Sequence, residues 1–298
     1  MYMLTHDTFP NSPEERVKMA EFLFGTVGTP KSAPSSPGGT IGTIEYLSSI
    51  GLHALEIGWV RSVRVSEKTC EKIKMTGRNN NVELSVHAPY YINLNADEEE
   101  WPKSRKRLMD AAHYGSLAGA TDIVFHPGSA FGDRPAARRK AIPRLEGCLQ
   151  ELAEAGDTAR LRPESMGKSA QLGTIEDLIT FNQALPQVEP CLDFAHIHAR
   201  AGDGSCNTYD EWCSILEQLG ASMKDGALQR LHCHLSGIAY TEKGEQHHLM
   251  LRDSDFNLNA LLRALAAFDC GGRIVCESPD DMDKDAQYIK ETWEEISG

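Results

Sequence analysis

Six short apolar runs in the sequence each end at a residue whose side chain can bind a metal ion. A stretch with the apolar periodicity of a helix follows each run, and alternating strands and helices predict a parallel sheet with helical crossovers. If such a sheet closes into an eight-stranded barrel, the carboxyl ends of its strands meet at one face, where active sites lie. The runs cover residues 82–86, 121–125, 159–163, 188–192, 228–233 and 273–276, and the residues that follow them are His87, His126, Glu164, Asp193, His234 and Glu277.

Together, these six residues predict a metal site. A single histidine after a strand is more often structural than a ligand. Six candidates at six successive strand ends are hard to explain by packing, because aspartate and glutamate are rarely buried unless they are paired or bound to metal. Carboxylates and imidazoles gathered at one face are typical metal ligands.

We predict an α/β fold with one (β/α)8 TIM barrel over residues 21–298, the catalytic domain, preceded by an N-terminal extension over residues 1–20. The extension carries a helix-start pattern at Ser12, Pro13 and Glu15. Two further strands are expected at residues 22–25 and 53–57. Helices are expected near residues 44–50, 66–78, 101–118, 134–155, 175–183, 209–219, 258–268 and from 284 onward.

Composition excludes several other classes of protein. No apolar run is long enough to span a bilayer, and the first residues lack the apolar core of a secretory signal. The eight cysteines form no C-x-x-C pair, which fits a reduced, cytoplasmic protein. The net charge of −13 argues against non-specific nucleic-acid binding over the whole surface, although a local cationic groove remains compatible with it.

Two further segments offer ligands. His196 follows Asp193 by three residues, within reach of the same pocket. Glu245 and His247 are two apart, so in an extended segment both would point the same way and could bind one ion; the alternative is a polar loop tip. His232 would share the face of His234, and we interpret it as a core histidine.

Aromatic and basic residues lie close to the candidate ligands. Tyr90 and Tyr91 follow His87 directly, at the expected barrel mouth. They could wedge between or stack on bases, or they could cover the top of the core. The basic residues of 134–140 could contact phosphate or form a solvated helix face.

Several of these motifs together resemble endonuclease IV, the family of metal-dependent apurinic/apyrimidinic endonucleases. The likeness runs from about residue 22 to the C-terminus, and the chain reads as a divergent branch. It implies a TIM barrel with three zinc ions, manganese being an alternative metal, that cleaves double-stranded DNA 5′ to abasic sites. The motifs are HAPYYINL from His87, FHPGS from Phe125, DFAH from Asp193, HLS from His234 and CE at Cys276.

The resemblance also implies a role for each site residue. His87, His126 and Glu164 would hold one ion; Glu164 would bridge to a second ion held by Asp193, His234 and Glu277; His196, Glu245 and His247 would hold the third. Glu164 and Glu277 would position the attacking hydroxide, and Tyr90 and Tyr91 would enter the duplex. The chain differs from the family at Glu245, where aspartate is usual, and at residues 251–255, which replace a glycine-rich stretch.

Two other readings stay open. Sugar isomerases and epimerases of the xylose-isomerase-like barrels also present Glu, Asp, His and Glu at strand ends, as Glu164, Asp193, His234 and Glu277 would, but they do not need the additional histidines. A barrel that binds DNA or protein without catalysis is the third reading, and the presence of a candidate for every ligand argues against it. We expect a monomer without membrane association.

Overall fold

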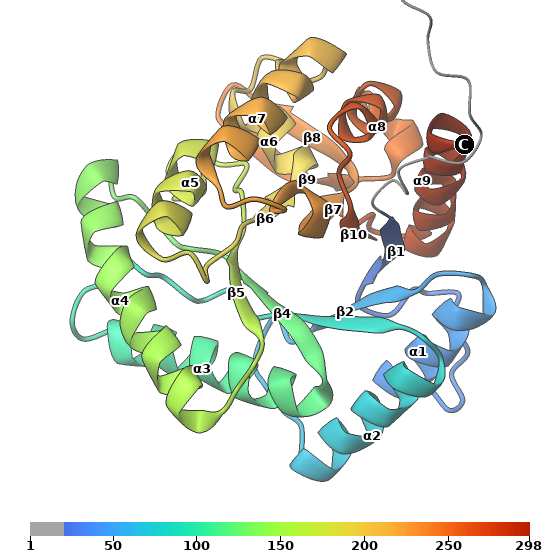
Figure 1. Cartoon of the computed structure of the whole chain (residues 1–298), viewed down its shortest axis with the longest axis horizontal. Coiled ribbons are helices and arrows are strands. Elements are labelled where there is room, and N and C mark those ends of the chain that lie inside the picture. Colours follow the sequence, from blue (N-terminus) through green and yellow to red (C-terminus); the bar gives the residue numbers. More distant parts are fainter. Residues whose placement is uncertain (1–20) are drawn as a thin grey trace, which may run out of the picture.

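The computed structural model describes residues 21–298, and these residues form a parallel eight-stranded barrel surrounded by helices (Figure 1). The strand order is β5-β4-β3-β2-β1-β10-β7-β6. The two end strands meet through a parallel bridge between Glu164 and Cys191, where the Ser165 amide donates to the Cys191 carbonyl at 3.0 Å. The predicted TIM barrel is therefore confirmed. The helix-start pattern at residues 12–15 lies outside the described residues.

The barrel strands are short, as the apolar runs predict. Each of the six runs overlaps a strand that ends at its candidate ligand or one residue from it. The barrel strands are β1 (Phe22–Val27), β2 (Ala54–Gly58), β3 (Glu83–His87), β4 (Ala120–Phe125), β5 (Arg160–Pro163), β6 (Cys191–Asp193), β7 (Leu231–Leu235) and β10 (Gly272–Cys276).

All the helices except α6 pack around the outside of the barrel, close to the predicted ranges. The helices are α1 (Gly39–Ser49), α2 (Glu67–Asn79), α3 (Trp101–Ala118), α4 (Arg134–Ala155), α5 (Ile175–Ala184), α6 (Phe194–Arg200), α7 (Tyr209–Ser222), α8 (Leu258–Ala267) and α9 (Met282–Ser297), with 3-10 turns η1 (Leu228–Arg230) and η2 (Leu251–Asp253). Among the described residues, no helix is long and apolar enough to cross a membrane.

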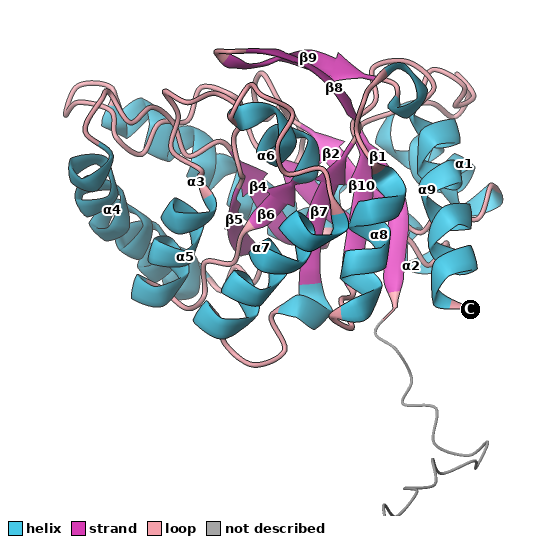
Figure 2. Ribbon diagram, turned by 90° about the horizontal axis from the view of Figure 1, so that it is seen from above, coloured by secondary structure: helices cyan, strands magenta, loops and turns pink. Residues whose placement is uncertain are grey.

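Two elements at the barrel mouth were not predicted. The antiparallel hairpin β8 (Gly237–Thr241) and β9 (Gly244–Leu249) lies across the mouth (Figure 2). The short helix α6 starts directly after β6, because the Asp193 carboxylate accepts from the His196 amide at 2.7 Å and caps the helix. Both elements bring side chains to the site from outside the barrel.

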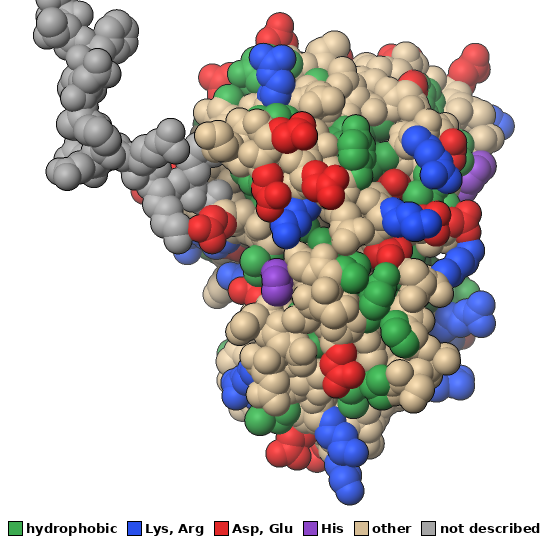
Figure 3. All heavy atoms as spheres, turned by 90° about the vertical axis from the view of Figure 1, so that its right-hand side faces the viewer, with side chains coloured by type: hydrophobic (Ala, Val, Ile, Leu, Met, Phe, Trp, Pro, Cys, Tyr) green, Lys and Arg blue, Asp and Glu red, His purple; other side chains and the backbone are tan. Residues whose placement is uncertain are grey.

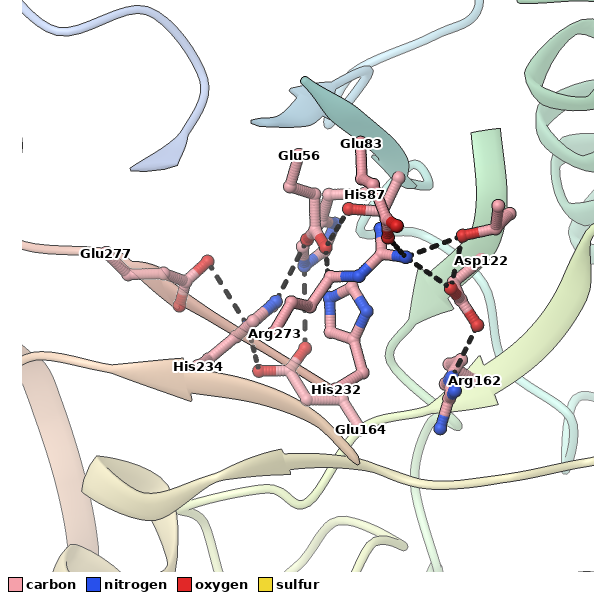
Figure 4. Close-up of polar contacts among 12 residues, drawn as sticks. Glu56, Glu83, His87, Asp122, Arg162, Glu164, His232, His234, Arg273 and Glu277 are labelled. Carbon is pink, nitrogen blue, oxygen red and sulfur yellow. Dashed lines mark hydrogen bonds and ion pairs between the residues drawn. The ribbon is translucent and has the colours of Figure 1, made fainter. Parts of the chain in front are cut away.

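The interior of the barrel is polar. Alternate residues of a strand point inward, and paired residues of parallel strands share a side, as His232 with Arg273 and Asp193 with His234 do. Charged side chains thus occupy three levels instead of the bulky apolar residues that usually fill such barrels. The amino-terminal level holds Asp122, Arg162 and Arg273, the middle level holds Glu56 and His232, and the mouth holds His87, Glu164, His234 and Glu277 (Figure 4). Ser85 contacts Glu56, and Asp193 pairs with His234.

The amino-terminal level is an ion-pair cluster around the buried carboxylate of Asp122. Its oxygens lie 2.7 Å from Arg162 Nε, 2.9 Å from Arg160 Nε and 3.2 Å from Arg273 Nη2. Burial by itself would raise the pKa of Asp122, but Arg162 and Arg273 outweigh burial and hold the pKa well below its usual value. The folded protein therefore favours the ionised carboxylate.

We predict that Asp122 makes the stability of the fold sensitive to acid. Because its folded pKa is depressed, its contribution is complete above about pH 4, the ordinary pKa of aspartate, and is lost as the pH falls toward the depressed value. Asp122→Asn should lower the free energy of unfolding at pH 7 by about 3–5 kcal/mol, since it leaves buried guanidinium groups unpaired. Urea unfolding at pH 7 and pH 3 should show the difference between the two proteins narrowing in acid; a constant difference would contradict this prediction.

Candidate metal centre

The first group of metal-binding side chains joins β3, β4 and β5 at the barrel mouth. Glu164 Oε2 lies 3.4 Å from His87 Nε2 and 3.2 Å from His126 Nε2. The ligand atoms of these three residues all lie within 4.8 Å of one another. His87 and Glu164 are buried, and His126 is partly open to the cavity. The predicted first set of ligands is therefore brought together by the fold.

A second group shares Glu164 with the first. Glu164, Asp193, His234 and Glu277 come from four strand ends, and their ligand atoms also lie within 4.8 Å of one another. His234 Nδ1 is 3.4 Å from Glu164 Oε1 and 3.6 Å from Glu277 Oε1. Since one oxygen of Glu164 faces each group, its carboxylate lies where it could bridge two ions.

The third group combines α6 with the hairpin. Asp193, His196 and His248 place ligand atoms within 4.8 Å of one another, and Glu245 Oε2 lies 3.5 Å from His196 Nε2. The hairpin is fixed to the loop after β5, where the Glu245 amide donates to the Gly167 carbonyl at 3.1 Å. A Cβ at Gly167 would lie 2.6 Å from Cβ of Glu245, so only glycine allows this close approach.

The structure corrects the prediction for His247. His247 is exposed and belongs to none of the groups, whereas His248 faces the cavity. The cause is a β-bulge: Tyr240 pairs with Glu245 and Ala239 with His247, which leaves Gln246 as an extra residue. An extra residue reverses the alternation of side chains beyond it, so Glu245 shares a face with His248. Simple alternation in the sequence cannot reveal this.

The candidate ligands fit a bound cation because several buried polar atoms lack any hydrogen-bond partner. These atoms are both carboxylate oxygens of Glu164, Asp193 Oδ2 and His234 Nδ1. Leaving a buried carboxylate without hydrogen bonds is costly. All four atoms point into the donor groups, and a divalent metal ion would satisfy them together. Imidazole and carboxylate donors suit zinc and also accept manganese.

Hydrogen bonds on the far side of three imidazoles leave the near nitrogen available. His87 Nδ1 donates to the Ala88 carbonyl at 2.9 Å, and His196 Nδ1 donates to the Ser165 carbonyl at 3.0 Å. His248 Nδ1 lies 2.6 Å from Ser236 Oγ, whose own proton is directed at the Gly237 carbonyl. In each case Nε2 is the nitrogen left to bind a metal ion, and it faces a carboxylate of the site.

The carboxylates of the metal-free site raise the pKa values of the neighbouring histidines, so the site favours positive charge. Burial lowers the pKa of His196, but the carboxylates of Asp193 and Glu164 outweigh burial and raise it to about 10. Burial likewise lowers the pKa of His87, and Glu164 raises it to about 9. Without metal, protons on the imidazoles thus balance the carboxylates. Metal ions would displace these protons.

Tyrosines form part of the rim of the cavity, which has a volume of about 400 Å³. Tyr90 lines the cavity and stacks on His126, with ring centroids 5.1 Å apart, and its edge meets His87. Tyr91 is 66% exposed and lies beside Arg107, outside the donor groups. The aromatic side chains predicted at the mouth are therefore there, and only Tyr90 touches candidate ligands.

Other polar residues near the site have structural partners. Arg134 and Arg138 of the basic segment both pair with the buried Asp177 of α5, which favours the helix-face reading for these two. His198 is buried in α6 against Asp255, whose second oxygen accepts from Tyr240 of β8. This contact ties α6, the hairpin and the segment after it together.

Glu56 is the residue that sequence reasoning missed. It is fully buried inside the barrel beside His232 and His234. The signal was present in the sequence, because Glu56 interrupts the apolar run at residues 53–57. Glu56 was not predicted as a site residue because it lies inside β2, below the mouth, and not after the end of a strand.

Comparison with known proteins finds relatives along most of the chain. A family model described as xylose isomerase-like TIM barrel matches residues 44–295. An uncharacterized protein of Methanocaldococcus jannaschii is 34% identical over 276 residues, which cover 92% of this chain and 97% of that protein. An endonuclease 4 of Thermus thermophilus is 27% identical over 175 residues, which cover 55% of this chain and 61% of that protein.

Solved structures share the fold with proteins of two kinds. An endonuclease IV from Thermus thermophilus has a TM-score of 0.68 at 22% identity, over 92% of this chain and 99% of that one. A D-tagatose 3-epimerase-like protein has a TM-score of 0.68 at 18% identity, over 92% of this chain and 98% of that one. At these identities the likeness concerns the fold alone, so it does not choose between the two activities.

We predict that His248 and His247 differ in their effect on metal binding. His248→Ala should lower the metal affinity of the third donor group by at least about 10-fold. That is the lower end of the loss seen when a partner of a metal ligand is removed. His247→Ala, a matched change on the opposite face of the hairpin, should leave metal content unchanged. Metal analysis after dialysis against a mild chelator measures both, and the third ion should leave first. Loss of metal from the His247 variant alone would restore the original assignment.

Proposed function

The chain belongs to the xylose isomerase-like TIM barrel family, and within this family we propose that it is a metal-dependent endonuclease that cleaves double-stranded DNA 5′ to abasic sites. One observation carries the proposal: donor groups sufficient for three ions surround Glu164 and Asp193. A barrel that acts on a small sugar with one or two metals has no need of His87, His126 and His196. We expect zinc, with manganese as the alternative.

In this proposal the three donor groups would hold one ion each. Divalent ions would supply Lewis acidity, which stabilises charge on phosphoryl oxygens and lowers the pKa of water to about 7. Burial would raise the pKa of Glu277, but the charge of His234 outweighs burial and lowers it to about 2, so its carboxylate is ionised and can accept a hydrogen bond from the attacking water. With Glu164, it would orient that water toward phosphorus.

The rim would engage the DNA. Tyr90 packs against the ligand imidazoles and shields them from solvent, while Tyr91 projects outward beside Arg107. Extrusion of an abasic nucleotide costs little, because no base has to be unpaired. The side of the barrel seen in Figure 3 shows Lys and Arg side chains interspersed with Asp and Glu.

A sugar epimerase or isomerase is the second candidate. Glu164, Asp193, His234 and Glu277 form a complete four-residue donor set, and such a set could bind one ion and a small polyol without the other histidines. A D-tagatose 3-epimerase-like protein also shares the fold. Metal stoichiometry separates the candidates: three ions per chain support the nuclease, and one or two support the epimerase.

We predict that Glu164→Gln abolishes incision of an abasic-site duplex and leaves the fold intact. The amide keeps the size of the side chain but removes the charge that both the first and second donor groups share. Gel analysis of a 5′-labelled duplex with zinc or manganese measures incision, and circular dichroism checks the fold. A folded variant with full activity would refute the assignment. Epimerisation of a ketose by the wild-type protein, without incision, would favour the second candidate.

We predict that Tyr91→Ala weakens binding of abasic duplex by about 1–3 kcal/mol, the scale of one aromatic–base stacking contact. Metal content should not change, because Tyr91 touches no candidate ligand. Tyr90→Ala should weaken duplex binding similarly and can also lower metal content, since Tyr90 stacks on His126. Fluorescence anisotropy with a labelled duplex gives the affinities. Unchanged affinity in both variants would mean that these tyrosines only cover the core.

A further inference from the structure

We infer that Glu56 is a positioning residue of the metal centre, which orients His234 from inside the barrel. This inference rests on the metal site of the proposed function but not on DNA as the substrate. Glu56 belongs to β2, which like β1 contributes no candidate ligand at its end. Its influence on the site would pass through the middle level of the barrel (Figure 4).

The contacts of Glu56 are few and specific. Its side chain is fully buried. Oε2 accepts from His232 Nε2 at 2.7 Å and from Ser85 Oγ at 3.0 Å. Oε1 lies 3.0 Å from His234 Nε2. One carboxylate therefore contacts two imidazoles from the same strand, β7, each through its Nε2.

This arrangement decides which nitrogen of His234 faces the donor groups. A carboxylate next to Nε2 favours the tautomer with the proton on Nε2, which leaves the lone pair on Nδ1. Nδ1 is the atom that faces Glu164 and Glu277. Neither nitrogen of His234 has a hydrogen-bond partner, so the approach of Nε2 to Glu56 Oε1 is a close ion-pair contact. Glu56 therefore lies where its charge would favour the orientation and tautomer of His234 that a metal ion requires.

His234 differs in this respect from the other histidines of the site. His87 and His196 are held by backbone carbonyls, and His248 contacts a serine hydroxyl. A carboxylate partner also makes the imidazole a stronger donor to a metal ion, and loss of such partners typically costs 10–100-fold in affinity. His234 belongs to the central group, so Glu56 would act on the ion that Glu164 shares with the first group.

The competing explanation is that Glu56 only fills the core. A buried carboxylate needs partners, and His232 together with Ser85 would supply them even if His234 played no part. The two explanations differ in what a neutral isostere does. A core-filling role predicts an effect on folding stability, whereas a positioning role predicts an effect on metal affinity in a protein that is still folded.

The test compares Glu56→Gln with Glu189→Gln, each in the full chain. Glu189 is a nearly buried carboxylate at the other end of the barrel, paired with Arg230 and Arg162, so it matches the chemical change without contact to the site. Zinc affinity is measured by competition with a chromophoric chelator. Unfolding of the metal-free proteins by urea is measured in parallel.

We expect Glu56→Gln to lower zinc affinity by about 10–100-fold and Glu189→Gln to leave it unchanged. Glu56→Asp, which keeps the charge, should recover part of the affinity. These readouts need no DNA, so a wild-type protein without nuclease activity would sink the proposed function and leave this inference standing.

Two results would overturn the inference. One is a folded Glu56→Gln variant that binds zinc as tightly as the wild type. The other is an equal loss of affinity in the Glu56 and Glu189 variants that follows their loss of stability, which would make Glu56 a core residue.

Discussion

Charge balance inside the closed barrel is the constraint that the rest of the structure depends on. The strands point alternate side chains into a space that excludes water, and many of these side chains are ionisable. At the amino-terminal end the balance is internal, because guanidinium groups surround Asp122. At the mouth, carboxylates meet only imidazoles, and several of their atoms remain without partners. The unpartnered carboxylate oxygens of Glu164 and Asp193 thus lie at the open end of the barrel, where a cation can enter.

The sequence was informative about everything that depends on a short, local pattern. Strand ends and helix ranges could be predicted because apolar runs and helical periodicity are properties of neighbouring residues. The barrel then brought the predicted strand-end residues together, since parallel strands in a closed sheet align their carboxyl ends. The expectation that Glu245 lies near His196 came from the family resemblance, because the two residues are far apart in the sequence.

What the sequence could not predict depends on register or on contacts between distant strands. Because of the bulge at Gln246, His248 and not His247 faces the cavity. The bulge results from a shift in the register between β8 and β9. Glu56 looks like an interruption of an apolar run until His232 and His234, far along the chain, are placed beside it. The donors that distinguish a multi-metal site from a simpler one lie partly on α6 and the hairpin, so the barrel fold by itself says little about the reaction.

The closure of the barrel has a consequence for its dynamics. β5 and β6 are the two ends of the sheet, and Glu164 makes the bridge to Cys191 that joins them. The side chain of the same residue lies between the first two donor groups. An ion held there would hold the seam of the barrel closed, so metal occupancy and local opening are thermodynamically linked. Amide hydrogen exchange at Ser165 would report this linkage directly, because that amide is released only when the two end strands separate.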